Sequence, residues 1–351
     1  MTGQIAQNTN KSAMPTAILQ QQVMSDDGSF HEVPTLDLGA YLDGDLAARD
    51  SLAEQLRYIQ ENIGFYYVIN HGIPRAPIDR AYKALQEFCA LPMEEKLKLK
   101  IDHNSVGYIP PESTVYVTSI VNKNTEKDLN ETITLARERT PDHPHIKAGY
   151  RFCGPNPWPE QLPEFKEAMI DYQNTLSRLG YAMLPLYALA LGKPADFFDP
   201  FFAEPTWWTR NAHYPPARAK DNQFGIAPHC DHSFMTLLPI SEVPGLEILT
   251  PEGDWLVAKP VKDSIIVNTG EFLNRWTNGR FMATPHRVVP PQKDRYSMAM
   301  FFNPSPDTVA EPLDTCVSED NPAKYEPISM HDYMCWYIDT NYKRDAGGVQ
   351  A

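Results

Sequence analysis

Short apolar runs that recur through the second half of the chain place the strongest limit on its fold. Each run is rich in Val, Ile, Phe or Trp, and Pro, Gly, Asn or Asp residues separate it from the next. Short strands joined by turns at this spacing are typical of an antiparallel sandwich or barrel. Proline supplies 32 of the 351 residues, which also disfavours a bundle of long helices. The runs lie at 207–214, 234–240, 246–249, 255–258, 264–268, 286–289 and 296–302.

The first half of the chain alternates between strand and helix patterns. Apolar alternation at 33–38 and a β-branched, aromatic run at 65–69 predict strands. Apolar residues with helical spacing at 46–62 and 78–88 predict helices. We therefore expect an α/β cap ahead of the β-rich half.

The middle and the end of the chain carry two further helix patterns. The longest helix is expected over 162–191, where Pro185 should kink or break it. Residues 101–157 read as irregular, apart from a strand at 131–136, and the final segment 329–342 reads as helical.

Charge and cysteine content exclude several classes of function. The formal net charge of −14 disfavours nucleic acid and anionic membranes as partners, and no apolar stretch is long enough to span a bilayer. The five cysteines are scattered and form no Cys-x-x-Cys pair, which suits a reducing compartment. We expect a cytoplasmic protein, a monomer or weak homo-oligomer, that acts on a small molecule.

Three residues of the β-rich half could hold a metal ion. His229 and Asp231 are two positions apart, so on a strand their side chains would point to one side, and His286 begins a later strand. Two imidazoles and one carboxylate form the facial triad that holds non-haem Fe(II) while leaving positions open for substrate and dioxygen. Such a triplet also occurs by chance, in turns or surface hydrogen bonds.

A second pair of residues could hold an acid beside that metal. Arg295 and Ser297 share one side of a predicted strand, and apolar residues flank them. A guanidinium can bind a carboxylate with two hydrogen bonds, and a neighbouring hydroxyl adds a third. The other interpretation is a solvated surface arginine.

The order of these motifs resembles the isopenicillin N synthase-like branch of the 2-oxoglutarate- and Fe(II)-dependent oxygenases. The likeness extends over about residues 33–340, and several motifs in one order are more specific than any single motif. The motifs are His229-Cys230-Asp231, Asn268-Thr269-Gly270, Thr284-Pro285-His286-Arg287-Val288, Arg295-Tyr296-Ser297, the segment 64–73 with Asn70-His71-Gly72, and Gly154-Pro155-Asn156-Pro157-Trp158-Pro159.

The resemblance implies a mainly β fold with flanking helices, built on a double-stranded β-helix, or jelly roll. Residues 1–32 carry no periodicity and are rich in Gln, Asn, Ser and Thr, which predicts a disordered arm. The resemblance divides the rest of the chain into an α/β cap over 33–160, a helix with the jelly-roll core over 161–340, and a tail over 341–351. It also implies Fe(II), 2-oxoglutarate and O₂ as reactants.

The resemblance assigns roles to individual residues. His229, Asp231 and His286 match the iron ligands, while Arg295, Ser297 and Tyr214 match the residues that bind the distal carboxylate of 2-oxoglutarate. Where the family often has Asn, two residues before that tyrosine, this chain has Ala212, which puts one co-substrate hydrogen bond in doubt. Phe301 and Arg210 match substrate-pocket positions.

Substrate specificity is expected to lie in less regular parts of the chain. Loops often carry function, so Tyr108 and Tyr116 in segment 101–125, together with the C-terminal helix, are the candidate specificity residues. His232 directly follows Asp231 and, on a strand, would face away from the site.

The expected activity is hydroxylation of a small organic molecule, or its desaturation or cyclisation, with release of succinate and CO₂. Two alternatives remain at this point. One is an Fe(II) oxidase on the same scaffold that does not use 2-oxoglutarate, as isopenicillin N synthase itself does not. The other is a non-catalytic, metal-binding β-barrel module.

Overall fold

The computed structural model describes residues 23–25 and 30–344. Most of the predicted arm (1–32) and the end of the predicted tail (341–351) lie outside the described residues. Within the arm, Val23 and Phe30 are buried in the main hydrophobic core, with 4% and 7% of their surface exposed. The ordered structure therefore begins before residue 33.

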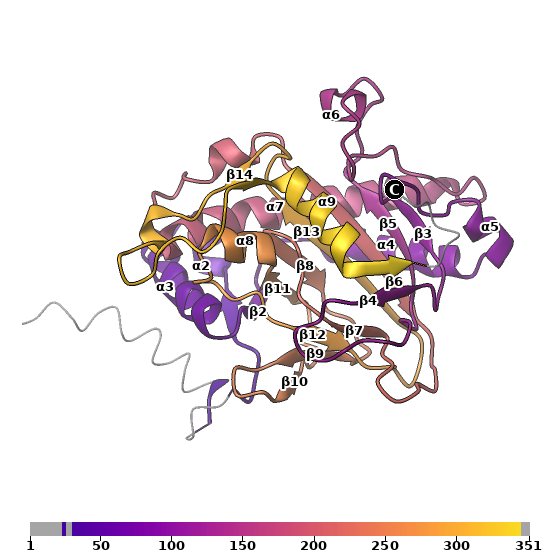
Figure 1. Cartoon of the computed structure of the whole chain (residues 1–351), viewed down its shortest axis with the longest axis horizontal. Helices are drawn as coiled ribbons and strands as arrows, with labels where there is room; N and C mark the ends of the chain where they lie inside the picture. The colour runs from indigo at the N-terminus through magenta and orange to yellow at the C-terminus, as the bar shows by residue number, and fades with distance from the viewer. Residues whose placement is uncertain (1–22, 26–29, 345–351) are drawn as a thin grey trace, which may run out of the picture.

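A large sheet of eight strands forms the centre of the molecule (Figure 1). Only its first two strands are parallel, and the other neighbours pair antiparallel. In spatial order the strands are β1 (Thr35–Asp37), β2 (Phe65–Ile69), β11 (Ile265–Thr269), β8 (Met235–Pro239), β13 (Arg295–Asn303), β6 (Thr206–Tyr214), β5 (Glu131–Ala136) and β3 (Gly107–Ile109).

A second sheet of four antiparallel strands lies below the large sheet in the view of Figure 1. The two sheets are the two halves of the expected jelly roll, and the cavities described below lie between them. In spatial order the smaller sheet contains β10 (Trp255–Val257), β9 (Leu246–Leu249), β12 (His286–Val288) and β7 (Ile226–His229).

Helices cover the outer face of the large sheet. Alternate residues of β13, such as Met298, Met300 and Phe302, join the apolar residues of these helices in one core. The long helices are α3 (Leu46–Asn62), α4 (Arg75–Cys89) and α7 (Pro163–Ala190). The short ones are α2 (Gly39–Leu42), α5 (Met93–Leu97), α6 (Pro144–Lys147) and α8 (Glu271–Trp276), with 3₁₀ turns at Asp199–Phe202 and Asp314–Cys316.

The C-terminal segment closes one end of the barrel. Helix α9 (Met330–Asn341) leads directly into β16 (Tyr342–Arg344), which pairs antiparallel with β4 (Thr114–Tyr116). A second small sheet joins β14 (Val309–Ala310) to β15 (Ile328–Ser329). Part of the predicted tail is therefore a strand beside the barrel mouth.

The structure corrects two sequence-based expectations. Residues 101–157 are not irregular throughout, because they contain β3 and β4 as well as β5. Of the two outcomes expected at Pro185, a kink or a break, the break does not occur, because α7 continues to Ala190. The neighbours Leu184 and Leu186 are buried in the core, and this packing offsets the hydrogen bond that proline cannot donate.

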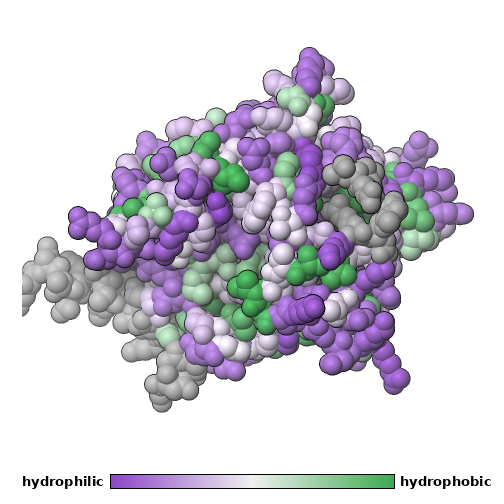
Figure 2. Space-filling view, in the orientation of Figure 1, coloured by the Kyte–Doolittle hydropathy of each residue, from purple (hydrophilic) through white to green (hydrophobic). Residues whose placement is uncertain are grey.

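The surface is mostly hydrophilic, but hydrophobic residues gather between α3 and β4 on the face shown in Figure 2. Separately, Ile120 and Trp336 are 84% and 52% exposed and line a cavity that reaches His229. Within the described residues, no helix is both long and apolar enough to cross a membrane.

Candidate functional site

Three side chains converge inside the barrel. His229 ends β7 and His286 begins β12, and the two residues face each other as a cross-strand pair. Asp231 lies just beyond β7, with Oδ1 at 3.7 Å from Nε2 of His229 and 3.6 Å from Nε2 of His286. One ligand atom from each residue lies within 4.8 Å of the others, which is close enough for all three to bind one ion.

The backbone fixes which nitrogen of each imidazole faces that point. Nδ1 of His229 lies 2.8 Å from the carbonyl oxygen of Ala227, and Nδ1 of His286 lies 3.1 Å from that of Thr284. A carbonyl oxygen only accepts, so each Nδ1 carries the proton. Each Nε2 is left with a free lone pair, the arrangement that metal-binding histidines use.

The carboxylate of Asp231 is oriented in the same way. Its Oδ2 accepts hydrogen bonds from Oγ1 of Thr236 at 2.6 Å and Nδ2 of Asn268 at 2.8 Å, so Oδ1 is free to bind an ion. Asn268 belongs to the Asn-Thr-Gly motif, and the motif's Gly270 packs directly on the backbone of Ser233, where a Cβ would overlap it. The Asn-Thr-Gly motif therefore holds the Asp231 carboxylate in the orientation that leaves Oδ1 free.

The charges at this point suit a divalent cation. Burial and the neighbouring His286 hold the pKa of His229 below its ordinary value. Burial alone would raise the pKa of Asp231, but His286, His229 and the two hydrogen bonds lower it below its ordinary value. A neutral imidazole and an ionised carboxylate are the forms that bind metals, and this N₂O donor set suits Fe(II).

A cavity on one side of this triad ends at a buried guanidinium. This cavity, the Arg295 cavity, is lined at that end by Arg295, Ser297 and Tyr214. Arg295 is only 2% exposed, its Nε donates to the carbonyl of Val243 at 3.1 Å, and its Nη1 has no partner. Among the described residues it makes no ion pair, so a bound carboxylate would supply the missing partner.

The position of Ala212 leaves part of this wall apolar. Ala212 pairs with Ser297 across β6 and β13 and lines the Arg295 cavity. Its neighbour on β5 is Thr132, whose buried Oγ1 has no partner. The family asparagine therefore has no side-chain equivalent at position 212, although an unpaired hydroxyl lies on the adjacent strand.

A second cavity lies on the other side of the triad. This Trp208 cavity is lined by aromatic side chains that include Trp208, Phe301 and His232, and by the guanidinium of Arg210. His229, Asp231, Arg210, Ile226 and Phe301 line both cavities, so the two spaces meet at the triad.

His232 is a site residue that the sequence analysis misplaced. The chain leaves β7 after His229, so strand alternation no longer applies, and the His232 ring faces the Trp208 cavity. Its centroid lies 4.5 Å from that of Phe301 and 5.1 Å from that of Trp208. No signal in the sequence marks this change of direction.

The two tyrosines of segment 101–125 have different surroundings. Tyr116 lies near the triad, with its ring 5.9 Å from that of His229, and Tyr342 of β16 packs against it at 5.3 Å. Tyr108 lines neither cavity. Its hydroxyl donates to Glu131 at 2.5 Å on the opposite face of the sheet, and we no longer count it among the substrate-binding residues.

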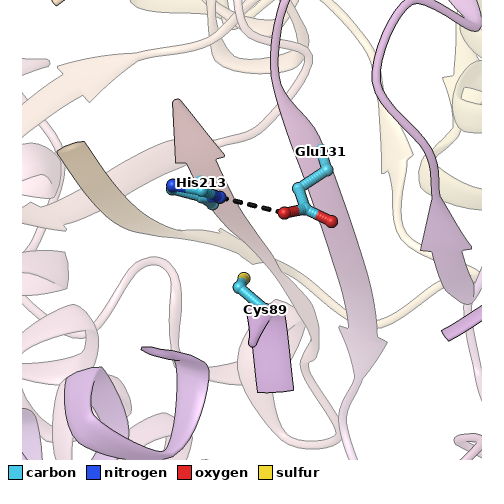
Figure 3. A group of neighbouring side chains, drawn as sticks. All are labelled: Cys89, Glu131 and His213. Carbon is cyan, nitrogen blue, oxygen red and sulfur yellow. Dashed lines mark hydrogen bonds and ion pairs between the residues drawn. The ribbon is translucent and has the colours of Figure 1, made fainter. Parts of the chain in front are cut away.

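A second group of potential ligands lies on that opposite face. Figure 3 shows Cys89 of α4, Glu131 of β5 and His213 of β6, whose ligand atoms lie within 4.8 Å of one another. Both Glu131 oxygens are already engaged, Oε1 with His213 at 2.9 Å and Oε2 with Lys96 at 2.7 Å and with Tyr108. The buried ammonium would oppose a metal ion, so we interpret this group as an ion network.

Comparison with known proteins gives two family matches that follow one another along the chain. Residues 33–161 match the family described as non-haem dioxygenase in morphine synthesis N-terminal. Residues 206–304 match the 2OG-Fe(II) oxygenase superfamily. The second match contains the triad, Arg295 and Ser297.

Individual relatives extend the likeness over most of the chain. Kihadalactone A synthase LFS of Citrus sinensis is 38% identical over 77% of this chain and 82% of its own. The 2-oxoglutarate-Fe(II) type oxidoreductase hxnY of Emericella nidulans is 32% identical over 91% of both chains. The solved structure of a full-length Neurospora crassa protein in complex with alpha-KG (2-oxoglutarate) has a TM-score of 0.77 at 26% identity and covers 91% of this chain and 99% of its own.

Proposed function

The chain belongs to the 2OG-Fe(II) oxygenase superfamily, and from that premise we propose which of its residues hold each reactant. The protein is a 2-oxoglutarate-dependent dioxygenase with a jelly-roll fold that uses Fe(II) and acts on small molecules. The expected family, fold class and cofactors are thereby confirmed. The prediction of a 2-oxoglutarate-dependent oxygenase is therefore favoured over the 2-oxoglutarate-independent oxidase and the non-catalytic module.

We assign Fe(II) to His229, Asp231 and His286. The support is the pair of free Nε2 atoms and the free Oδ1, each held in place by a hydrogen bond on its other side. Bound there, Fe(II) with 2-oxoglutarate would supply the O₂-dependent oxidation of a substrate C–H bond, with 2-oxoglutarate converted to succinate and CO₂.

We assign the distal carboxylate of 2-oxoglutarate to Arg295, Ser297 and Tyr214. The observation that carries this assignment is the unpaired, buried Nη1 of Arg295 in a cavity that the triad also lines. Burial raises the pKa of Tyr214, so its phenol stays neutral and can donate a hydrogen bond. The protein thus binds and orients the acid.

We assign the substrate to the Trp208 cavity. Phe301 and Arg210 line it, and Tyr116 borders the adjoining cavity that also reaches His229. The mostly apolar wall excludes water from the reacting centre. Hydroxylation is the expected outcome, and desaturation or cyclisation would require only a different substrate pose. We further propose a cytoplasmic location, which the five free cysteines support, and a monomer or weak homo-oligomer.

Binding measurements on four variants test these assignments. His229→Ala and Asp231→Ala should no longer bind stoichiometric Fe(II) when titrated without O₂. In air both variants should lose all turnover, and both should retain the fold. Arg295→Met should still bind Fe(II) but bind 2-oxoglutarate at least about tenfold more weakly, the usual effect of losing a charged hydrogen bond.

Arg139→Met provides the matched control. Arg139 is also buried, with unpaired Nε and Nη1, but it donates to Pro205 outside the cavities. If Arg295→Met and Arg139→Met bind 2-oxoglutarate equally well, the carboxylate assignment is wrong.

A further inference from the structure

The Trp208 cavity holds one cationic side chain whose charge no carboxylate contacts. Arg210 lies on β6, two residues after Trp208, so both side chains point to the same face. Its Nη2 lies 3.2 Å from Oδ1 of Asn130, and its buried Nε has no partner. Within the described part of the chain, Arg210 makes no ion pair.

The charges of the proposed reactants leave Arg210 uncompensated. Fe(II) contributes two positive charges and Arg295 one. Asp231 contributes one negative charge and 2-oxoglutarate two, so that centre is neutral overall. Arg210 then remains as one extra positive charge beside the substrate space. Arg210 is half-buried and its Nη2 already contacts Asn130, but its buried Nε lacks a partner, and a carboxylate on the substrate would supply one.

Besides Asp231, which lines the same cavity, Asp128 is a protein carboxylate near enough to influence this charge. Asp128 is buried, its Oδ1 accepts from the backbone nitrogen of Ala227, and its Oδ2 has no partner. Burial raises its pKa to about 7 although Arg210 opposes the shift. Burial thus disfavours the charged form of Asp128, and Asp128 makes no contact ion pair with Arg210.

The rest of the cavity favours a flat, apolar body. Phe301 and Trp208 are a cross-strand pair with ring centroids 6.0 Å apart, and His232 packs on both. Tyr337 of α9 faces this wall, 5.0 Å from the His232 ring. Such a surface contacts an aromatic ring over a large area and offers few hydrogen bonds.

We propose that the substrate is a planar aromatic molecule with one carboxylate, which binds Arg210 while its ring packs on Trp208 and Phe301. This inference rests on the proposed function, because it places the substrate beside the Fe(II) and 2-oxoglutarate sites. It adds a chemical class: an aromatic monocarboxylate in preference to a neutral or non-aromatic compound. A guanidinium binds a carboxylate with two hydrogen bonds, and the free Nε is available for one of them.

The test uses the full-length protein loaded with Fe(II) and saturating 2-oxoglutarate without O₂, so that binding is measured without turnover. Calorimetry compares three probes: 2-naphthoate, its neutral amide 2-naphthamide, and the saturated decahydro-2-naphthoate. We expect 2-naphthoate to bind at least about tenfold more tightly than 2-naphthamide, as for a charged hydrogen bond. It should also bind more tightly than the saturated acid.

Arg210→Met should reduce the preference for the acid over the amide to about onefold, while 2-oxoglutarate affinity stays within about threefold. Arg210→Lys should keep part of the preference, because it keeps the charge but loses the planar two-bond geometry. The wild-type comparison of acid with amide needs no variant, so it decides the question even if a substitution prevents folding.

Three results with the naphthalene probes would overturn the inference. They are no binding of 2-naphthoate, no preference for the acid in the wild type, and an Arg210→Met protein that retains the preference. A tenfold loss of 2-oxoglutarate affinity in Arg210→Met would overturn it as well, since Arg210 would then serve the co-substrate. Failure of the proposed function looks different: 2-oxoglutarate would not bind, or its binding would not depend on Arg295.

Discussion

Replacing Asn268 with Ala tests whether the Asn-Thr-Gly motif works through the metal site. Asn268 contacts Asp231 by one hydrogen bond of 2.8 Å to Oδ2, and Thr236 donates to the same oxygen at 2.6 Å. Without the amide, Asp231 can rotate and offer Oδ1 less often in the position that binds Fe(II). The substitution leaves all three proposed ligands in place.

The size of the effect follows from this geometry. A hydrogen bond to a charged group contributes about 1.5–3 kcal/mol, or roughly 10- to 150-fold in a binding constant. Groups that orient metal ligands typically change metal affinity by about 10- to 100-fold. Because Thr236 still holds Oδ2, we expect a loss of about tenfold for Asn268→Ala and about 100-fold when Thr236→Val is added.

The assay is competition for Fe(II) against a chelator of known affinity, without O₂. Asn211→Ala is the matched control. Asn211 is equally buried, but it lies on the other face of the large sheet, where its amide donates to the carbonyl of Ile133 at 2.9 Å. We expect this control to lose stability and keep its Fe(II) affinity. An Asn268→Ala protein that binds Fe(II) within about twofold of wild type would refute the reasoning.

Two further predictions concern packing and pH. Gly270→Ala should lower the free energy of unfolding by about 1–3 kcal/mol and weaken Fe(II) binding, because the added Cβ would overlap the Ser233 backbone. Urea unfolding and titration with Fe(II) measure the two effects. Wild-type values in both measurements would contradict this prediction. Burial alone would raise the pKa of Glu131, but hydrogen bonds from His213, Lys96 and Tyr108 lower it from 4.5 to about 2. The contribution of Glu131 to stability is therefore present above pH 4.5 and lost as the pH falls toward 2. Burial alone would lower the pKa of His213, but its hydrogen bonds to Glu131 and Asp294 raise it above 6.5. The contribution of His213 to stability is therefore present below pH 6.5 and lost as the pH rises through this raised pKa. In urea unfolding measured from pH 3 to about 9, Glu131→Gln should reduce the loss of stability at both the acidic and the basic end. A pH profile unchanged from wild type would contradict the ion network.

Short-range patterns made much of the fold and site predictable. A β-branched, aromatic run predicted the strand at 65–69, and helical periodicity predicted the helix at 46–62, both with the observed bounds. Strand alternation placed Arg295 and Ser297 on one side of β13, where both line one cavity. Each of these features depends on residues that are near one another in the sequence.

The features that the sequence did not reveal depend on pairing between distant segments. Tyr108 points away from the substrate space because β3 pairs with β5, which turns its hydroxyl toward Glu131. Tyr342 reaches the Trp208 cavity because β16 pairs with β4. His232 turns inward because β7 ends two residues before Asp231. No local pattern specifies these registers.

A crystal structure of the protein soaked with Fe(II) and 2-oxoglutarate without O₂, with anomalous data at the iron edge, tests the central assignment most directly. We predict one iron peak bound by Nε2 of His229, Nε2 of His286 and Oδ1 of Asp231, with the distal carboxylate of 2-oxoglutarate on Arg295. An iron peak at Cys89, Glu131 and His213 instead, or 2-oxoglutarate bound away from Arg295, would contradict it.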